Sequence, residues 1–411
     1  MGWKKLNTIT PENNIVTFVS EYIGNFALKN SKIKPTAKYL CFTAVEDLEL
    51  GFGEYQTMSR KPQLQYSIDD MDAWEDYTLN TAVALSAGQK CYWRGLTTTL
   101  NSTTEYLYFD STGKVEASGE VDSLINWASL SSGCYRYLFK GCSELLTAPE
   151  LPSTELANYC YDHMFQGCTN LILPPELPAT VMKNDCYYGM FFRCYGLTKA
   201  PALPSTQLAT WCYRDMFNGC ESLVEAPELP ATTLKAYCYY GMFAGCESLV
   251  TPPELPATTL DQYCYGQMFS ACKSLATAPA LPATVLKRDC YDGMFQSCYA
   301  LTESPALPAT TLADFCYMYM FSGCKNLVKI PRLNAVTLPH CCYAEMFNLC
   351  AKIKFSDVQT DEYKYAFRIP YEGMGEDVDD SALNSMFAGT SGTVKGTPLI
   401  NTTYYTSNEI I

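Results

Sequence analysis

The chain has 411 residues, of which 48% are hydrophobic, and its formal net charge is −14. This length allows two or three domains, and the hydrophobic content allows a large core. Because no long run of Lys or Arg offsets the acidic balance, neither nucleic acid nor an anionic membrane surface is expected as a partner. No stretch approaches the roughly 18 apolar residues of a membrane-spanning helix, so no membrane insertion is expected.

Residues 1–36 are predicted to form an N-terminal arm or edge strand that docks on another subunit or on the following domain. The first residues, MGWKKLNTITPENN, contain two lysines but no apolar segment behind them. That pattern is not typical of a signal peptide. The chain is therefore expected either to fold in a bacterial cytosol or to derive from a precursor whose signal has been removed.

Residues 37–125 contain short runs in which apolar and polar side chains alternate, and turn-forming residues separate these runs. The runs are YLCFTAV, LQYSI, KCYWRGL and EYLYFD. Alternation with a period of two is typical of strands with one buried face. We therefore predict a small all-β sandwich domain over residues 37–125.

Residues 126–353 repeat with a period of 26, and cysteine shows the period most clearly. Two cysteine columns step through the sequence without a slip and contain 18 of the 21 cysteines. The first column is Cys134, Cys160, Cys186, Cys212, Cys238, Cys264, Cys290, Cys316 and Cys342, and the second is Cys142, Cys168, Cys194, Cys220, Cys246, Cys272, Cys298, Cys324 and Cys350. Tyr, Met, Phe and Leu columns keep the same spacing. Nine units of this kind predict a solenoid, in which each unit buries its apolar face against its neighbours.

One unit, residues 238–263, reads CYYGMFAGCESLVTPPELPATTLDQY. At about 100° per residue, Cys238, Tyr239, Met242 and Phe243 fall on one side of a helix, so we predict a short amphipathic helix that Gly245 ends. Lys235 would lie on the buried face, so the helix should begin after it. The proline-rich segment ESLVTPPELP instead favours a strand of about two to four residues.

Stacked strands are about 4.8 Å apart and packed helices about 8–10 Å, so the predicted stack curves, with strands on its concave face and helices on its convex face. Right-handed crossovers then give a right-handed superhelix. The expected fold class is thus an α/β solenoid, leucine-rich-repeat-like, of nine 26-residue units after the β-sandwich. A degenerate tenth copy, ALNSMFAGT at residues 382–390, places Ala382 and Thr390 in the two Cys positions. Residues 354–411 are predicted to form this degenerate repeat and a C-terminal cap.

The paired cysteines allow two interpretations. On a helix, residues eight apart are separated by about 12 Å, whereas a disulfide needs Cα atoms within roughly 7 Å, so free buried thiols are favoured over disulfides. Zinc is not expected, because the sequence has no CxxC and only two histidines, His163 and His340. No metal site and no cofactor are predicted.

No catalytic constellation is apparent, so the chain is not expected to be an enzyme. With two histidines there is almost no material for Ser–His–Asp or Cys–His arrangements. His163 is expected to be exposed, and the proximity of His340 to Cys341 is attributed to chance.

Two variable columns are the candidate ligand-binding positions. The position before each first Cys varies while the core columns do not, and it faces outward on the predicted helix; its residues are Tyr159, Asp185, Trp211, Tyr237, Tyr263, Asp289 and Phe315. Exposed Tyr and Trp favour recognition, although they could instead pack on neighbouring units. The second column holds Glu150, Glu176, Glu228 and Glu254. These glutamates could bind a cation or a basic partner, or form a solvated acidic stripe.

The pattern LPATTLxxxCYxxMFxGCxSLxxAP resembles the BspA-type leucine-rich repeat, IPxxVxxIgxxAFxxCxxLxxIxIP. Over residues 126–353 the match recurs nine times, and in one unit it is carried by Leu229-Pro230, Leu234, Met242-Phe243, Cys246 and Leu249. The units are longer than usual, and Ala-Pro replaces the β-branched strand centre. The segments FTAVED, YSIDD and YWRG, which begin at Phe42, Tyr66 and Tyr92, are similar to a module that precedes such repeats.

This resemblance implies a non-enzymatic recognition or adhesion protein of the kind that gut bacteria and their bacteriophages carry. Its partner would be a host surface glycan or protein, and other virion subunits could bind the N-terminal region. The expected location is the virion, or alternatively the bacterial cell surface or the extracellular space. A structural component that decorates a capsid or tail without a host ligand is the alternative function.

Overall fold

A computed structural model describes residues 38–411 of the chain, and two small sheets begin this described part. The arm or edge strand predicted for residues 1–36 lies outside the described residues. One sheet has the strand order β4-β3-β6-β1-β8-β9, and the other has the order β5-β2-β7. Their strands are β1 (Leu40–Ala44), β2 (Leu48–Glu54), β3 (Leu64–Ile68), β4 (Glu75–Asp76), β5 (Val83–Leu85), β6 (Lys90–Gly95), β7 (Leu107–Ser111), β8 (Val115–Ser118) and β9 (Leu145–Thr147). Each alternating run of the sequence contains or overlaps one of these strands.

Aromatic side chains fill the space between the two sheets. Phe42 and Phe109 stack with ring centroids 4.1 Å apart, and Phe52 contacts Trp93 edge-on at 4.9 Å. Phe42 also contacts Phe139, which belongs to the repeats. The apolar core therefore continues from the sheets into the solenoid, and residues 38–411 form one compact unit. The boundaries predicted at residues 125 and 353 stay predictions.

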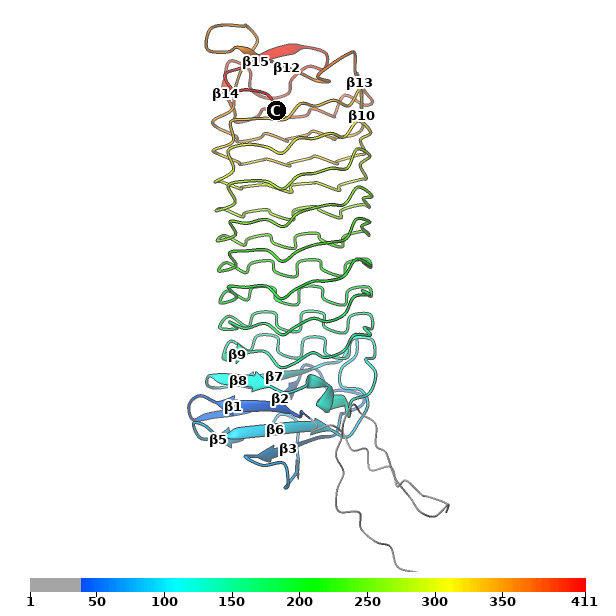
Figure 1. The fold of residues 1–411 in the computed structure, drawn as a ribbon, viewed down its shortest axis with the longest axis vertical. Coiled ribbons are helices and arrows are strands. Elements are labelled where there is room, and N and C mark those ends of the chain that lie inside the picture. The colour runs from blue at the N-terminus through cyan, green and yellow to red at the C-terminus, as the bar shows by residue number, and fades with distance from the viewer. Residues whose placement is uncertain (1–37) are drawn as a thin grey trace, which may run out of the picture. The chain divides into compact units, whose positions relative to one another are not determined.

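The backbone joins the sheets to the repeats in the same way. Strand β8 pairs in parallel with β9, which lies in the first repeat, and the Phe109 N–H donates to the Leu138 carbonyl at 2.7 Å. Figure 1 shows these strands stacked directly below the repeats. The sheets thus cover the N-terminal end of the repeat core.

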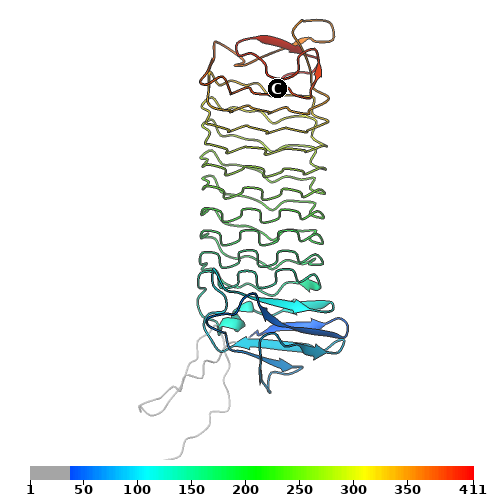
Figure 2. The same cartoon turned by 180° about the vertical axis from the view of Figure 1, so that it is seen from behind.

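The repeats form a solenoid in which each 26-residue unit is one coil, but the predicted helices are wrong. Within residues 38–411 there is no α-helix, and the one helical segment is the 3-10 turn η1 (Val121–Ile125). Residues 237–246 instead form a turn ribbon, a series of overlapping β-turns, and equivalent residues do so in every coil. Figure 2 shows the stepped path that these turns give to one side of the solenoid.

Backbone hydrogen bonds of the turn ribbon alternate between two directions. The N–H groups of Tyr240, Met242 and Ala244 donate to carbonyls three residues earlier, at 3.3, 3.2 and 3.0 Å. Those of Tyr239, Gly241 and Phe243 donate to carbonyls of the next coil, at 3.1, 2.8 and 2.9 Å. Every N–H of the segment is therefore satisfied without a helix or a conventional strand.

Every fourth residue of the ribbon has a positive φ, and this redirects the chain. The three positions are the residue before the first Cys and the third and seventh residues after it, and all 27 such residues in the nine coils have φ between 48° and 80°. The first Cys and the residues one, four, five and eight after it then point inward. On a helix these five positions would lie within an arc of about 140°, so a period of four was mistaken for 3.6.

Stacked aromatic side chains fill the interior. The nine Tyr residues from Tyr135 to Tyr343 stack with ring centroids 5.6–5.9 Å apart. The nine Phe residues from Phe139 to Phe347 stack at 5.3–5.8 Å. All are buried, as the sequence predicts for the Phe column.

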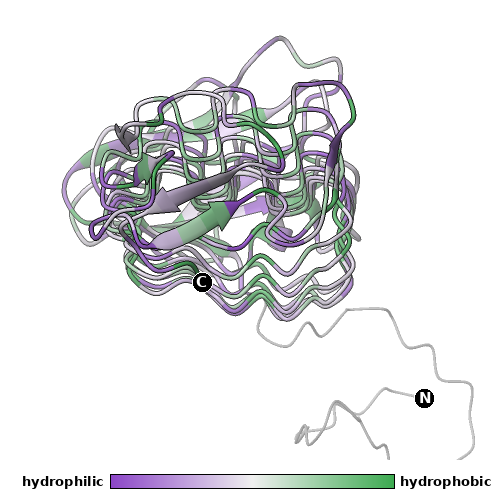
Figure 3. Cartoon of the chain, turned by 90° about the horizontal axis from the view of Figure 1, so that it is seen from above, coloured by the Kyte–Doolittle hydropathy of each residue, from purple (hydrophilic) through white to green (hydrophobic). Residues whose placement is uncertain are grey.

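The proline-rich side has few backbone contacts between coils. Proline cannot donate, and the coils meet there only at isolated bridges such as Glu225–Thr251 and Thr233–Thr259. Curvature was predicted because packed helices are spaced more widely than stacked strands. The described residues contain no such helices, and backbone hydrogen bonds join adjacent coils on both the ribbon side and the proline-rich side, so this difference in spacing is absent. The coils lie nearly on top of one another in Figure 3. The prediction of convex helical and concave strand faces is therefore wrong, and the handedness of the coil stays a prediction.

All 21 cysteines are free, as favoured from the sequence, and 20 of them are buried. The helical spacing used to argue against disulfides does not apply, because there is no helix. A hydrogen bond instead explains the second Cys column. The thiol of Cys246 donates to the Phe217 carbonyl of the preceding coil at 3.1 Å, and seven other coils repeat this contact.

The C-terminal segment covers the other end of the core. The Tyr343 N–H donates to the Ala382 carbonyl at 2.9 Å, which is the contact that Tyr317 makes to Cys342, so the degenerate tenth copy continues the stack. Phe387 then stacks on Phe355 at 3.8 Å. The strands here are β10 (Thr337–Leu338), β11 (Lys354–Ser356), β12 (Tyr365–Arg368), β13 (Glu376–Asp377), β14 (Ser391–Gly392) and β15 (Thr403–Thr406), paired as β10-β13 and β12-β15-β11-β14.

The positive φ of the ribbon predicts opposite effects for two substitutions at equivalent positions. Gly245 has φ 71° and Ala271 has φ 60°. A Cβ at Gly245 would come no closer than 3.5 Å to its neighbours. The substitution Gly245→Ala therefore tests the backbone strain of a positive φ and not a steric clash. Gly245→Ala should lower the free energy of unfolding by about 1 kcal/mol, and Ala271→Gly should raise it. Urea unfolding measures both, and a shift of the two variants in the same direction would contradict the assignment.

Candidate functional site

The variable column before each first Cys forms a row of contacting side chains on the outside of the ribbon. Trp211 and Tyr237 have ring centroids 5.0 Å apart, and Tyr237 stacks on Tyr263 at 4.4 Å with an interplanar angle of 9°. All three are half-buried. The positive φ of these residues places them at the corners of the ribbon. They thus face outward, as predicted, but they also pack on one another.

A second variable column lies beside the first, two residues after each first Cys, and the sequence reasoning missed it. Its Arg214 guanidinium lies 4.3 Å from the Trp211 ring centroid, 5.1 Å from that of Tyr240 and 5.3 Å from that of Tyr188. Arg214 also pairs with Asp215 at 3.1 Å. We call Tyr188, Trp211, Arg214, Tyr237, Tyr240 and Tyr263 the aromatic face. Two sequence features could have revealed the aromatic face: both columns vary among the repeats, and the inward positions between them recur every four residues.

Carboxylates border the aromatic face on its N-terminal side. Asp185, expected to be exposed, is only 8% exposed. Burial and the neighbouring Asp162 raise its pKa to about 6, against the opposing effect of Tyr159. Asp162 is itself buried and accepts a 2.7 Å hydrogen bond from Arg136. This border is therefore a fixed polar cluster.

His163 belongs to the same border, and its expected exposure is wrong. Its side chain is only 14% exposed and contacts the Asp162 carboxylate through Nδ1. The ring lies between Tyr137 and Tyr188, with centroids 5.4 and 4.5 Å away.

A matching acidic cluster borders the aromatic face on its C-terminal side. Asp289, also expected to be exposed, is buried and accepts a 3.1 Å hydrogen bond from Arg288. Burial, followed by the charge of Asp289, raises the pKa of Asp292 to about 7, and Gln267 opposes the shift. Arg288 also lies 5.0 Å from the ring centroid of Phe315, the last aromatic residue of the predicted column.

The glutamate column lies apart from the aromatic face, on the proline-rich side. All four glutamates are exposed. Glu150 pairs with Lys38 at 2.7 Å. Glu228 lines a shallow groove of about 470 Å³ between Lys199 and Pro230, and Glu254 lines one of about 440 Å³ between Pro252 and Pro282. Whether these glutamates bind a cation or a basic partner stays a prediction.

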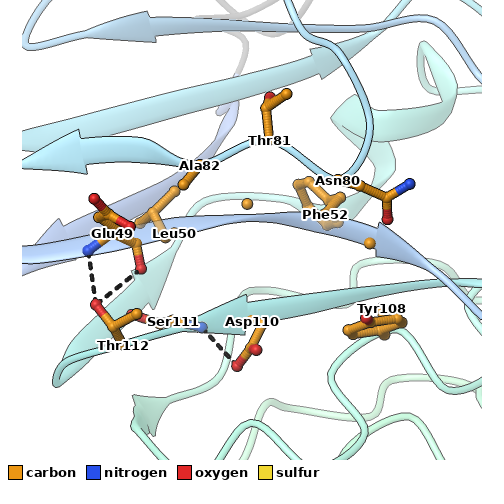
Figure 4. Close-up of a pocket in the computed structure, with 12 residues that line it drawn as sticks. Glu49, Leu50, Phe52, Asn80, Thr81, Ala82, Tyr108, Asp110, Ser111 and Thr112 are labelled. Atoms are coloured by element: carbon orange, nitrogen blue, oxygen red, sulfur yellow. Dashed lines mark hydrogen bonds between the residues drawn. The ribbon is translucent and has the colours of Figure 1, made fainter.

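A small polar pocket of about 280 Å³ lies in the N-terminal sheets, and no sequence pattern predicted it. Its floor is β2, where a Cβ on Gly51 would lie 2.4 Å from the Tyr77 hydroxyl. Figure 4 shows Glu49, Asn80 and Asp110 around the opening. The pocket is open to solvent, and polar side chains such as Glu49, Asn80 and Asp110 line it beside Leu50 and Phe52.

Within residues 38–411, no group of three or more His, Cys, Asp or Glu side chains is arranged to hold a metal ion. The same residues include no helix that could cross a bilayer. No protein-family model, no curated protein and no solved structure matches the chain.

Burial of Asp292 predicts a pH-dependent stability. Its pKa is raised from 3.8 in the unfolded chain to about 7, so the folded state retains a proton that the unfolded state loses. This contribution to stability should be complete below pH 4 and lost as the pH rises to about 7. Asp292→Asn should therefore stabilise the protein more at pH 8 than at pH 4, as measured by urea unfolding.

Glu254→Gln is the matched control, because Glu254 is exposed on another side of the coil. An equal gain for Asp292→Asn at both pH values would show that the carboxyl is not held protonated.

Proposed function

We propose that the protein is a non-enzymatic recognition or adhesion protein that binds a host surface glycan or protein through the aromatic face. The observation that carries this proposal is the gathering of five aromatic rings and Arg214 on the outside of an otherwise regular solenoid. The fold does not require an aromatic residue or arginine at these positions, because Gly133, Asp289, Gly266 and Ala344 occupy equivalent positions in other coils.

The geometry of the aromatic face indicates how it would bind. Tyr237 and Tyr263 stack on each other, and each keeps part of its side chain exposed to solvent. Tyr side chains offer a large rigid contact area at low entropic cost, together with a hydrogen-bonding group. A ligand that combines apolar patches with hydroxyl or amide groups, as glycans and protein loops do, would suit such a surface.

The biological setting belongs to the same proposal. The BspA-like repeat pattern supports a bacteriophage virion appendage, with a cell-surface or secreted protein as the alternative. A right-handed coil, expected from the handedness of crossover connections, belongs to the same proposal. The N-terminal region would then attach the protein to other virion subunits.

The test is binding of the fluorescently labelled full chain to a panel of intact gut bacteria, with Trp211→Ala and Tyr237→Ala as variants. Truncating a central aromatic contact typically costs about 2 kcal/mol, so each variant should bind roughly thirtyfold more weakly. Tyr195→Ala is the control, because Tyr195 is 39% exposed and lies outside the aromatic face. Periodate or protease treatment of the cells distinguishes glycan from protein ligands.

Unchanged binding by both variants would exclude the aromatic face as the site. If the protein bound no cell but assembled with virion subunits, the structural alternative would replace adhesion.

A further inference from the structure

The side chains of His340, Cys341, Asp379 and Ser381 meet where the ninth coil joins the C-terminal segment. The Cys341 Sγ lies 3.5 Å from His340 Nε2. The other ring nitrogen, Nδ1, contacts the Asp379 carboxylate and lies 2.9 Å from the Ser381 hydroxyl. A thiol, an imidazole and a carboxylate thus follow one another in hydrogen-bonding contact.

The coil geometry explains why this thiol differs from the other 20. Cys341 occupies the corner before the first Cys of its coil, with φ 48°, so its side chain points outward. It is the one cysteine of the chain that is not buried. The inward cysteines are shielded by the core, and several donate to carbonyl groups. A reagent in solution therefore meets Cys341 first.

The carboxylate and the hydroxyl orient the imidazole. When Nδ1 carries the proton and donates it to Asp379, Nε2 is left as an acceptor that faces the thiol. Ser381 donates to Asp379 and accepts a 3.2 Å hydrogen bond from the Cys341 N–H. Hydrogen bonds from Ser381 and from His340 hold the pKa of the Asp379 carboxyl below its usual value, so the carboxylate stays charged.

The surroundings are acidic. The Asp377 carboxylate accepts a hydrogen bond from the N–H of Asp379. Glu345, in the ninth coil, accepts a 2.8 Å hydrogen bond from the Tyr319 hydroxyl. Asp380 adds a further carboxylate to this segment. The local field should therefore attract cations and repel anions, within the limits that salt screening sets.

We propose that Cys341 is a reactive thiol that exchanges with small cationic disulfides, with His340 as its general base. His340 Nε2 takes the thiol proton, and the Cys341 sulfur attacks one sulfur of the disulfide. The disulfide S–S bond breaks as a new one forms to Cys341. The departing thiolate takes the proton from His340, so one thiol and one disulfide are consumed and one of each is produced. This site is independent of the aromatic face.

The test is the reaction of the native full chain with cystamine, followed by intact mass and peptide mapping. One adduct per chain should form, at Cys341, and Cys341→Ser should abolish it. Unfolding the protein should expose the other 20 thiols. A first adduct on any other cysteine would overturn the proposal.

His340→Ala tests the base. The variant should react at least tenfold more slowly at pH 7, and its rate should rise about tenfold per pH unit between 6 and 8, as for an ordinary thiol. The wild-type rate should depend less steeply on pH. The matched control is His163→Ala, which removes a histidine far from Cys341 in sequence. If His340→Ala kept the wild-type rate and pH profile, Cys341 would be merely exposed and the proposal would be wrong.

The charge preference is tested with cystamine and the anionic dithiodiglycolate, each rate being divided by that of N-acetylcysteine with the same reagent. Cystamine should be favoured about tenfold at low salt, and less in 1 M salt. Asp379→Asn should lower the preference and slow the reaction with both reagents, whereas the matched Asp380→Asn should slow the reaction with cystamine and speed that with dithiodiglycolate. Equal normalised rates for both reagents would contradict selection of cations.

Discussion

The hydrogen bonds of the turn ribbon are the constraint on which the rest of the structure depends. Within 237–246, alternate N–H groups bond inside the coil and to the next coil, so the backbone satisfies itself with almost no help from side chains. This arrangement fixes the spacing of the coils. It also fixes which positions point inward, and the Tyr and Phe columns stack because adjacent coils are in register.

This backbone explains why some positions of the repeat are nearly the same in all nine coils and others vary. Inward positions must fill one fixed space, so their residue types hardly change along the chain. Outward positions contribute little to the hydrogen-bond ladder and are free to differ. The positive-φ corners are the strained positions of this backbone. A residue other than glycine at such a corner lowers the free energy of unfolding by about 1–2 kcal/mol. Placing Trp211, Tyr237 or Cys341 at such a corner suggests a use outside the fold, because glycine would fit with less strain.

The sequence predicts the solenoid, its period, the buried columns and the tenth copy, because each depends on the spacing of apolar residues. Free thiols were also favoured, but from a helical spacing that the structure does not contain. The sequence does not predict the local backbone, because inward pairs repeating every four residues also lie on one face of a helix. The glycines at 189, 241 and 293, and again at 219 and 245, contained the missing signal. Glycine recurring inside an apparent helix indicates positive φ rather than helix.

The same error limited the prediction of the site. Helical angles assigned the Tyr237 column correctly to the outside, but they gave no reason to join it to the column of Arg214. Asp185 and Asp289 were expected in water, whereas both are buried beside arginine and tyrosine. The contact between His340 and Asp379 spans 39 residues, so no local pattern could reveal it. Chemistry that depends on stacking between coils becomes visible only when the coil geometry is known, and in this protein the stacking brings together residues separated by about one repeat.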